Sequence, residues 1–407
     1  MNKIKQGIRV EDILTASRVK VFKLPENTPL EQQSSCPSCG GLLKTVCLFS
    51  SAQSNQKIRY GLCDFCGYSG YMDRPTKEWM VDFYRNKWDK QSPRTREDVI
   101  KSSVLPKEGE KAGRWLTFFL MNGLEIDKER PVCEIGCGYG EVLKNFAAAG
   151  FKNIIGVEHS DHRADFVRRN FGFTVLTGEF ENKNLQDQLR NFGPIGVFFS
   201  HHVLEHTYNP AEIINLISSL QNNGDYLFLS LPDSAGEHIN YALFYLVHLH
   251  SFTKESLELL LNKNGYEIIV DGSPDNTNII IAARKKADPS PRFKLGRDYC
   301  RSFTDRIKND LALGQMENHR FYNLYWRQKS DQQDYKSLRK IEPNGFLGRV
   351  GWNLKKAATL AKLRFLGRLS NGYSMLIKPL TEEFISSEDE EVPLKIQFKD
   401  GIKFLIK

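Results

Sequence analysis

The feature that most constrains this chain is a glycine-rich turn that follows a short apolar segment. Residues 131–143 read Pro-Val-Cys-Glu-Ile-Gly-Cys-Gly-Tyr-Gly-Glu-Val-Leu, so a short strand would end in closely spaced glycines and a helix would follow at once. Glycines let the backbone approach a ligand closely, and the helix directs its unsatisfied N–H groups and positive dipole end toward that ligand. The pattern indicates a site for a small charged cofactor, although such a run by itself also fits an ordinary tight turn.

A carboxylate at the end of the next apolar run supports the cofactor interpretation. Residues 153–158 read Asn-Ile-Ile-Gly-Val-Glu. Glu158 therefore lies about 20 residues beyond the glycines, where a doubly wound fold presents an acid to ribose hydroxyls. The Gly-x-Gly-x-Gly spacing, with Glu134 two residues before the first glycine, differs from the dinucleotide pattern. With these motifs the chain resembles the class I S-adenosylmethionine (SAM) dependent methyltransferases.

The resemblance implies an α/β fold with a Rossmann-like seven-stranded SAM methyltransferase sheet, and it assigns the cofactor residues. The first acid and the glycines would surround the methionine part of SAM, and Glu158 would accept both ribose hydroxyls. The turn after a third strand, at Glu179 or the backbone of Phe180, would contact the adenine. The expected cofactor-binding residues are therefore Glu134, Gly136, Gly138, Gly140, Glu158, Glu179 and Phe180.

Histidines gather where the sheet is expected to place its site. Residues 201–210 read His-His-Val-Leu-Glu-His-Thr-Tyr-Asn-Pro, which is similar to a segment found in a large branch of these enzymes. His201 follows the fourth expected strand, and His250 lies in a later loop at the same edge, so both are candidate catalytic bases. A purely structural role for these histidines stays open, and Glu205 and His206 fit helix capping as well as chemistry.

Four of the eight cysteines form two Cys-x-x-Cys-Gly turns, at Cys36, Cys39, Cys63 and Cys66. Two such turns supply four thiolates for a tetrahedral zinc, and four sulfur ligands leave no open position, so the metal would be structural. A pair of disulfides or uncoordinated thiols are the alternatives, and a reducing cytosol disfavours the disulfides.

Along the chain, the two cysteine turns are followed by a Pro-Thr pair and then by a Phe-Tyr helix. This order resembles the N-terminal zinc ribbon fused to methyltransferases of bacterial polysaccharide and sugar-modifying pathways. Sugar C-methyltransferases are among these relatives. The resemblance implies a small-molecule acceptor that contains a sugar, such as a glycoconjugate precursor, with the ribbon covering the substrate side of the cleft. Methylation at carbon and at oxygen both remain open.

The remaining sequence sets the expected organisation. We expect an N-terminal segment at residues 1–30, a zinc ribbon at 31–75, a helical linker at 76–110, a SAM methyltransferase domain at 111–285 and a mixed C-terminal extension at 286–407. The sequence shows no long apolar run and no signal-like start, so we expect a cytoplasmic protein. In the extension, Phe346–Leu369 is basic and amphipathic and could contact an anionic membrane, or dock on its own domain. Residues 394–406 suggest a final hairpin.

Two other functions stay open at this point. A basic chain with 57 Lys and Arg against 49 Asp and Glu, and a zinc ribbon, also fit an RNA methyltransferase. Against it, the chain lacks an Asn-Pro-Pro-Tyr type motif and its basic residues do not gather beside the cleft in sequence, so no nucleic-acid partner is expected. The second alternative is a non-catalytic, zinc-stabilised SAM fold that serves assembly or membrane docking. The complete glycine loop with both acids argues against that one.

Overall fold

The computed structural model describes the two folded parts of the chain. The described residues are 20–23, 28–51, 57–87, 124, 126–235, 247–273, 278–296, 298–303, 305, 395–398 and 403–406. The basic segment Phe346–Leu369 lies outside them.

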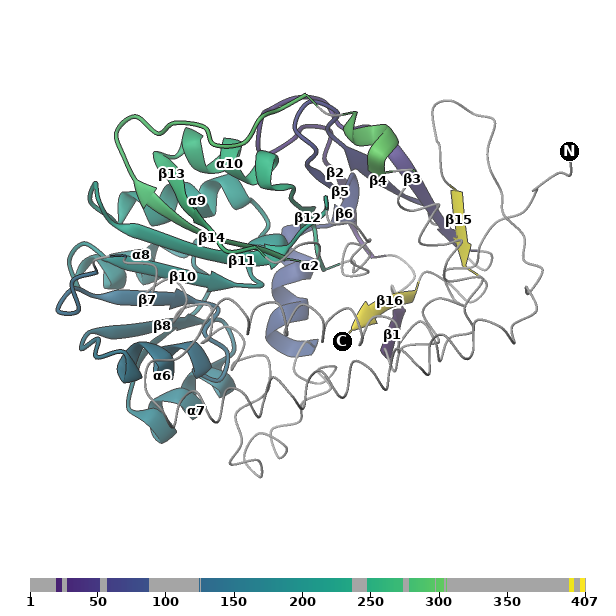
Figure 1. Ribbon diagram of the computed structural model, residues 1–407. Helices are drawn as coiled ribbons and strands as arrows, with labels where there is room; N and C mark the ends of the chain where they lie inside the picture. Colours follow the sequence, from purple (N-terminus) through teal and green to yellow (C-terminus); the bar gives the residue numbers. More distant parts are fainter. Residues whose placement is uncertain are drawn as a thin grey trace, which may run out of the picture.

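A seven-stranded sheet forms the larger part (Figure 1). Its order is β13-β14-β11-β10-β7-β8-β9, and β14 runs in the direction opposite to the other six strands. Buried strands covered on both faces need continuous apolar runs, which these segments supply. The sheet confirms the expected Rossmann-like architecture. Its strands are β7 (Val132–Ile135), β8 (Ile154–Glu158), β9 (Thr174–Thr177), β10 (Val197–His201), β11 (Tyr226–Pro232), β13 (Tyr266–Asp271) and β14 (Asn278–Lys285).

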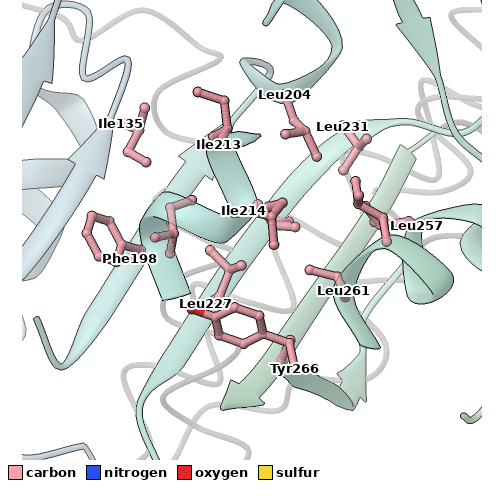
Figure 2. Close-up of a cluster of buried hydrophobic side chains, with 14 of the residues drawn as sticks. Ile135, Phe198, Leu204, Ile213, Ile214, Leu227, Leu231, Leu257, Leu261 and Tyr266 are labelled. Carbon is pink, nitrogen blue, oxygen red and sulfur yellow. The ribbon is translucent and has the colours of Figure 1, made fainter. Parts of the chain in front are cut away.

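Helices cover both faces of this sheet. Neighbouring strand residues point to opposite faces, so Phe198 packs in one hydrophobic cluster and Phe199 in the other. The Phe199 cluster includes side chains of α6 (Glu141–Ala148) and α7 (Asp161–Phe171). The other cluster includes α8 (Lys183–Arg190), α9 (Pro210–Ser219) and α10 (Lys254–Lys263). Figure 2 shows this second cluster, in which side chains of α9 and α10 pack over Phe198 and Leu227.

The cysteine-rich part is a small antiparallel sheet that the larger part completes. The strands β3, β4 and β5 pair in order, and β12 pairs with β5 at the edge. Since β12 lies between β11 and α10 in the chain, the segment around it belongs to both parts. Thr253 ties them again, because its Oγ1 donates to the backbone oxygen of Cys66 at 3.0 Å. The strands of this sheet are β3 (Lys44–Ser51), β4 (Lys57–Leu62), β5 (Ser69–Tyr71) and β12 (His250–Ser251), whereas β2 (Leu30–Gln32) and β6 (Asp73–Pro75) pair with each other as a separate two-stranded sheet.

A helix leads from the small sheet toward the large one. It begins after Thr76, whose hydroxyl accepts from the backbone N–H of Trp79 at 3.5 Å. The helix continues as α2 (Lys77–Asp82) and then as η1 (Phe83–Lys87), a π-helical turn. Figure 1 shows α2 between the two sheets. Turns of this kind occur often at functional sites.

The two strands nearest the C-terminus do not pair with each other, so the prediction of a hairpin at residues 394–406 is wrong. Instead β15 (Lys395–Phe398) pairs in parallel with β3, and β16 (Lys403–Ile406) pairs antiparallel with β1 (Lys20–Lys23). Each strand completes an edge that otherwise presents a row of backbone N–H and C=O groups. Among the described residues, no helix has the length and apolar character needed to cross a bilayer.

Candidate active site

The glycine turn lies where the chain changes direction across the sheet. From β7 the chain proceeds to β8 and β9 on one side and then crosses to β10 on the other, which makes the carboxyl ends of β7 and β10 the switch point. Gly136, Gly138 and Gly140 all have positive φ, of 72°, 53° and 79°. A Cβ on Gly136 would lie 2.5 Å from Val203 of the segment after β10, whereas a Cβ on Gly138 would meet open space. The turn therefore packs closely on one side and leaves room for a ligand on the other.

Two buried carboxylates flank this turn. Glu158 is 2% exposed and accepts the backbone N–H of Gly138 at 2.9 Å and of Ser160 at 3.0 Å. Glu134 is 4% exposed, and burial raises its pKa well above the ordinary value. Its Oε2 has no hydrogen-bond partner among the described residues. A buried carboxyl oxygen without a partner, at the end of the strand that leads into the glycine turn, fits a ligand that brings its own donors.

The turn after β9 contains Glu179 and Phe180, the residues expected to contact the adenine. Glu179 lies 3.6 Å from Arg85 of η1, measured from carboxylate oxygen to guanidinium nitrogen. The ring of Phe180 is buried and packs edge-on against Phe198, with ring centroids 6.1 Å apart. The ring of Phe180 is therefore occupied in the core, and only its backbone is left for the expected ligand contact.

The segment after β10 presents several polar side chains at the same edge. His201 ends the strand and is partly exposed, and its ring packs edge-on against His202 at 4.4 Å. His202 is the only non-glycine residue with positive φ, 53°, in the described part of the chain. Its Nδ1 lies 3.0 Å from Oε1 of the buried Glu205. Such an unusual backbone conformation persists only where the surroundings enforce it, and it concentrates at functional sites.

The sequence did not single out Tyr84, which η1 brings to this edge. Its hydroxyl lies 2.8 Å from Nδ1 of His206, and its ring packs edge-on against His159, which follows Glu158. The only sequence signal was the pair of aromatic residues in the helix after the cysteine turns. Its position beside the site depends on how that helix packs in three dimensions.

His250 lies inside the junction between the two sheets. It is 1% exposed, its Nε2 lies 2.9 Å from the backbone oxygen of Thr207, and its Nδ1 lies 2.5 Å from the hydroxyl of Tyr68. A carbonyl only accepts, so Nε2 donates and Nδ1 accepts from the tyrosine. Burial lowers the pKa of His250 to about 3. Both ring nitrogens are thus engaged in joining the cysteine-rich sheet to the loop after β10.

The four predicted cysteines converge, at Cys36, Cys39, Cys63 and Cys66. Their sulfur atoms lie 3.6 Å apart for Cys36 and Cys66, 3.4 Å for Cys39 and Cys63, and 3.7 Å for Cys39 and Cys66. All four are free thiols, and the backbone N–H of Gly41 lies 3.4 Å from the sulfur of Cys39. This four-sulfur cluster has the donor set and the compactness of a tetrahedral metal site.

A known family model matches the part of the chain that contains these residues. Residues 107–270 match the family model described as a methyltransferase domain. The chain matches none of the curated proteins with which it was compared.

Solved structures that resemble the chain include a SAM-dependent methyltransferase from Archaeoglobus fulgidus, with 18% identity, 44% of this chain and 94% of that chain covered, and a TM-score of 0.35. Another is the magnesium protoporphyrin IX methyltransferase of Synechocystis PCC 6803 with bound S-adenosylhomocysteine. It has 16% identity and a TM-score of 0.37, and the match covers 52% of this chain and 100% of that chain. A third is the CcbJ methyltransferase of Streptomyces caelestis. It has 15% identity and a TM-score of 0.36, and the match covers 51% of this chain and 96% of that chain.

The matched domain contains the glycine turn, both buried carboxylates and the polar edge after β10. Residues 107–270 of the chain therefore form a domain that matches the methyltransferase family model.

Proposed function

We propose that this chain is a SAM-dependent methyltransferase and that it acts on a small-molecule acceptor that contains a sugar, such as a glycoconjugate precursor. The observation that carries the proposal is the placement of the cysteine-rich sheet and its helix at the catalytic edge. Tyr84 contacts His206, and Arg74 donates to the backbone oxygen of Tyr208 at 3.0 Å. This part of the chain resembles the zinc ribbons of sugar-modifying methyltransferases, and it lies where an acceptor would enter.

The residues around the turn fit SAM. Gly138 would face the cofactor, Glu134 would supply a buried acceptor for its methionine part, and Glu158 would accept the ribose hydroxyls. Glu179 and the backbone of Phe180 would contact the adenine. When bound, SAM supplies an electrophilic methyl group on a sulfonium, so the protein mainly has to align a nucleophile and remove a proton.

For proton removal we propose His201. It ends β10 at the switch point and is partly exposed, and because its Nδ1 is buried the proton would go to Nε2. A base near neutral pH suits this task. His250 was the other candidate, and both of its ring nitrogens are hydrogen-bonded within the protein. We therefore propose that His250 positions the ribbon against the site while His201 receives the proton.

The four-cysteine cluster would hold a structural zinc ion. Sulfurs about 2.3 Å from a tetrahedral zinc lie roughly 3.8 Å from one another. The three separations of 3.4 to 3.7 Å are close to that value. A reducing compartment keeps such cysteines available to bind a metal, and we propose a cytoplasmic location for the protein.

Cofactor binding tests the proposal most directly. Replacing Glu158 with Ala removes charge-assisted hydrogen bonds to the ribose, each contributing about 1.5–3 kcal/mol, so titration calorimetry should show SAM affinity reduced by roughly ten- to a hundredfold or more. The exposed Glu129→Ala variant is the control and should bind normally.

The acceptor is tested with the same wild-type protein. Mass spectrometry after incubation with SAM and a panel of nucleotide-linked sugars should show one added methyl group on a sugar. Methyl incorporation into RNA in place of the sugars would contradict the proposed acceptor class, and unchanged SAM affinity in Glu158→Ala would contradict the cofactor site.

A further inference from the structure

Three potential metal ligands meet beside the proposed acceptor site. Glu205 and His206 belong to η2 (Leu204–His206), the short helical turn after β10, and His248 precedes β12. One ligand atom from each side chain lies within 4.8 Å of the other two. Glu205 is 1% exposed and His248 is 7% exposed, so the cluster lies inside the protein at the carboxyl edge of the sheet.

We propose that Glu205, His206 and His248 bind a divalent transition-metal cation. Two imidazoles and one carboxylate are a ligand set that suits first-row divalent ions such as zinc and iron. Three protein ligands leave at least one coordination position for water or a substrate oxygen. The site differs in this respect from the four-cysteine cluster, which closes around its metal.

Hydrogen bonds around the cluster orient its ligands. Nδ1 of His206 lies 3.0 Å from the backbone oxygen of Val247, to which it can only donate. An imidazole that carries its proton on Nδ1 presents a lone pair on Nε2, and a backbone carbonyl is a usual outer partner of a metal-binding histidine. Tyr84 supports the same ring, with its hydroxyl 2.8 Å from Nδ1.

The carboxylate is oriented in a comparable way. Nδ1 of His202 lies 3.0 Å from Oε1 of Glu205. The other oxygen, Oε2, is buried and has no hydrogen-bond partner among the described residues. A buried carboxylate oxygen without a partner is costly unless a ligand satisfies it, and a cation does so directly.

The present spacing requires a small contraction. Ligand atoms about 2.0–2.2 Å from one ion lie roughly 3–3.5 Å apart at tetrahedral or octahedral angles. The ligand atoms of the cluster lie within 4.8 Å of one another, so side-chain movements that shift these atoms by about 1 Å would close the site around an ion. The rings of His206 and His248 already pack edge-on, with centroids 4.4 Å apart.

The role of the ion rests on the proposed function. Tyr84 contacts both His206 and His159, and His159 follows the cofactor acid Glu158, so the cluster and the cofactor site share one edge. A bound cation lowers the pKa of a hydroxyl that coordinates it. The acceptor would then be a hydroxyl that coordinates the ion and loses its proton to His201. This favours methylation at oxygen.

Cobalt(II) binding tests the site without any turnover. Full-length protein with its cysteine cluster loaded with zinc is dialysed against cobalt(II), and both metals are then counted by mass spectrometry. Wild type should hold one cobalt beside one zinc, with visible absorption that lacks sulfur-to-cobalt charge transfer. Glu205→Gln and His248→Gln should each weaken cobalt binding at least tenfold. Glu212→Gln, an exposed change on the following helix, should leave it unchanged.

The other outcomes are equally informative. Wild-type protein that binds no cobalt, or variants that bind it as wild type does, would overturn the metal site. Cobalt that appears only with charge-transfer bands and an equal loss of zinc would also overturn it. SAM affinity measured on the same samples shows that each variant is folded. Cobalt binding without SAM binding in wild type would leave the metal site standing and refute the proposed function.

Discussion

Glu134 has a cost to stability and is one of the residues proposed to bind the cofactor. Burial raises its pKa above the ordinary value of 4.5, and the nearby charges of Glu141 and Glu158 act in the same direction. The folded protein therefore holds a proton that the unfolded chain has lost, and its stability falls as pH rises above about 4.5. A glutamine here carries no charge at any pH, so it avoids that loss.

The substitution Glu134→Gln should raise the melting temperature of the cofactor-free protein at pH 8. A gain of about 1–3 kcal/mol corresponds to several degrees for a domain of this size. The difference in melting temperature between variant and wild type should become smaller toward pH 5. The SAM affinity of the variant should be about tenfold lower. Thermal melts at both pH values check this, with the exposed Glu129→Gln as control. A variant that melts below wild type at pH 8 would show that the carboxylate stabilises the fold.

The local geometry of the proposed cofactor residues could be predicted from sequence because it depends on neighbours in the chain. Positive φ at Gly136 and Gly138 and the acid at the end of β8 come from neighbours in the chain. Tyr84 and the double hydrogen bonding of His250 could not be predicted in this way. Each depends on a partner more than 100 residues away, and a single sequence carries no signal of such a contact.

The two-residue strand β12 is the structural link between the cysteine-rich sheet and the methyltransferase domain. His250 pairs with Gly70 of β5, and a Cβ at Gly70 would lie 2.5 Å from the backbone oxygen of Leu249. The hydroxyl of Tyr68 donates to His250 within the same junction. Removing this donor leaves a buried nitrogen without a partner, which costs about 1–3 kcal/mol.

Tyr68→Phe should therefore lower the free energy of unfolding by about 1–3 kcal/mol while the ring still fills its space. Urea denaturation at neutral pH measures this loss. Tyr299→Phe is the matched control, because the hydroxyl lost there does not bond to His250, and its effect should be smaller. Equal stability of Tyr68→Phe and wild type would mean that this hydrogen bond contributes nothing to the junction.

The strands of the large sheet were predictable as long apolar runs, and β12 was not. Two residues, His250 and Ser251, carry no hydrophobic period, and only the open edge of β5 makes them a strand. The wrong hairpin near the C-terminus has the same origin. Both of its segments look like strands, but their partners, β3 and β1, lie far away in sequence. A sequence pattern indicates where a strand forms. It says much less about which other strand it pairs with.

The cysteine cluster and the large sheet should behave as one cooperative unit. The two share β12, and Thr253 caps α10 with its hydroxyl while that hydroxyl also donates to the backbone of Cys66. Gly67, in the second cysteine turn, packs so closely on Tyr299 that a Cβ would lie 2.5 Å from its ring. Loss of metal from the cluster would therefore disturb contacts made by both parts.

Zinc removal should accordingly lower the stability of the whole protein. A structural zinc contributes about 10–16 kcal/mol to the folding of small zinc domains, so Cys66→Ser should lose the metal and lower the melting temperature by more than about 10 °C. Calorimetry should show one transition in wild type, and SAM affinity should fall in the variant because η1 is no longer held at the edge of the sheet. Cys300→Ser, outside the cluster, is the control and should keep one zinc and the wild-type transition. A separate transition for the ribbon, with the main transition unmoved by zinc loss, would show that the two parts fold independently and that the ribbon does not hold the site together.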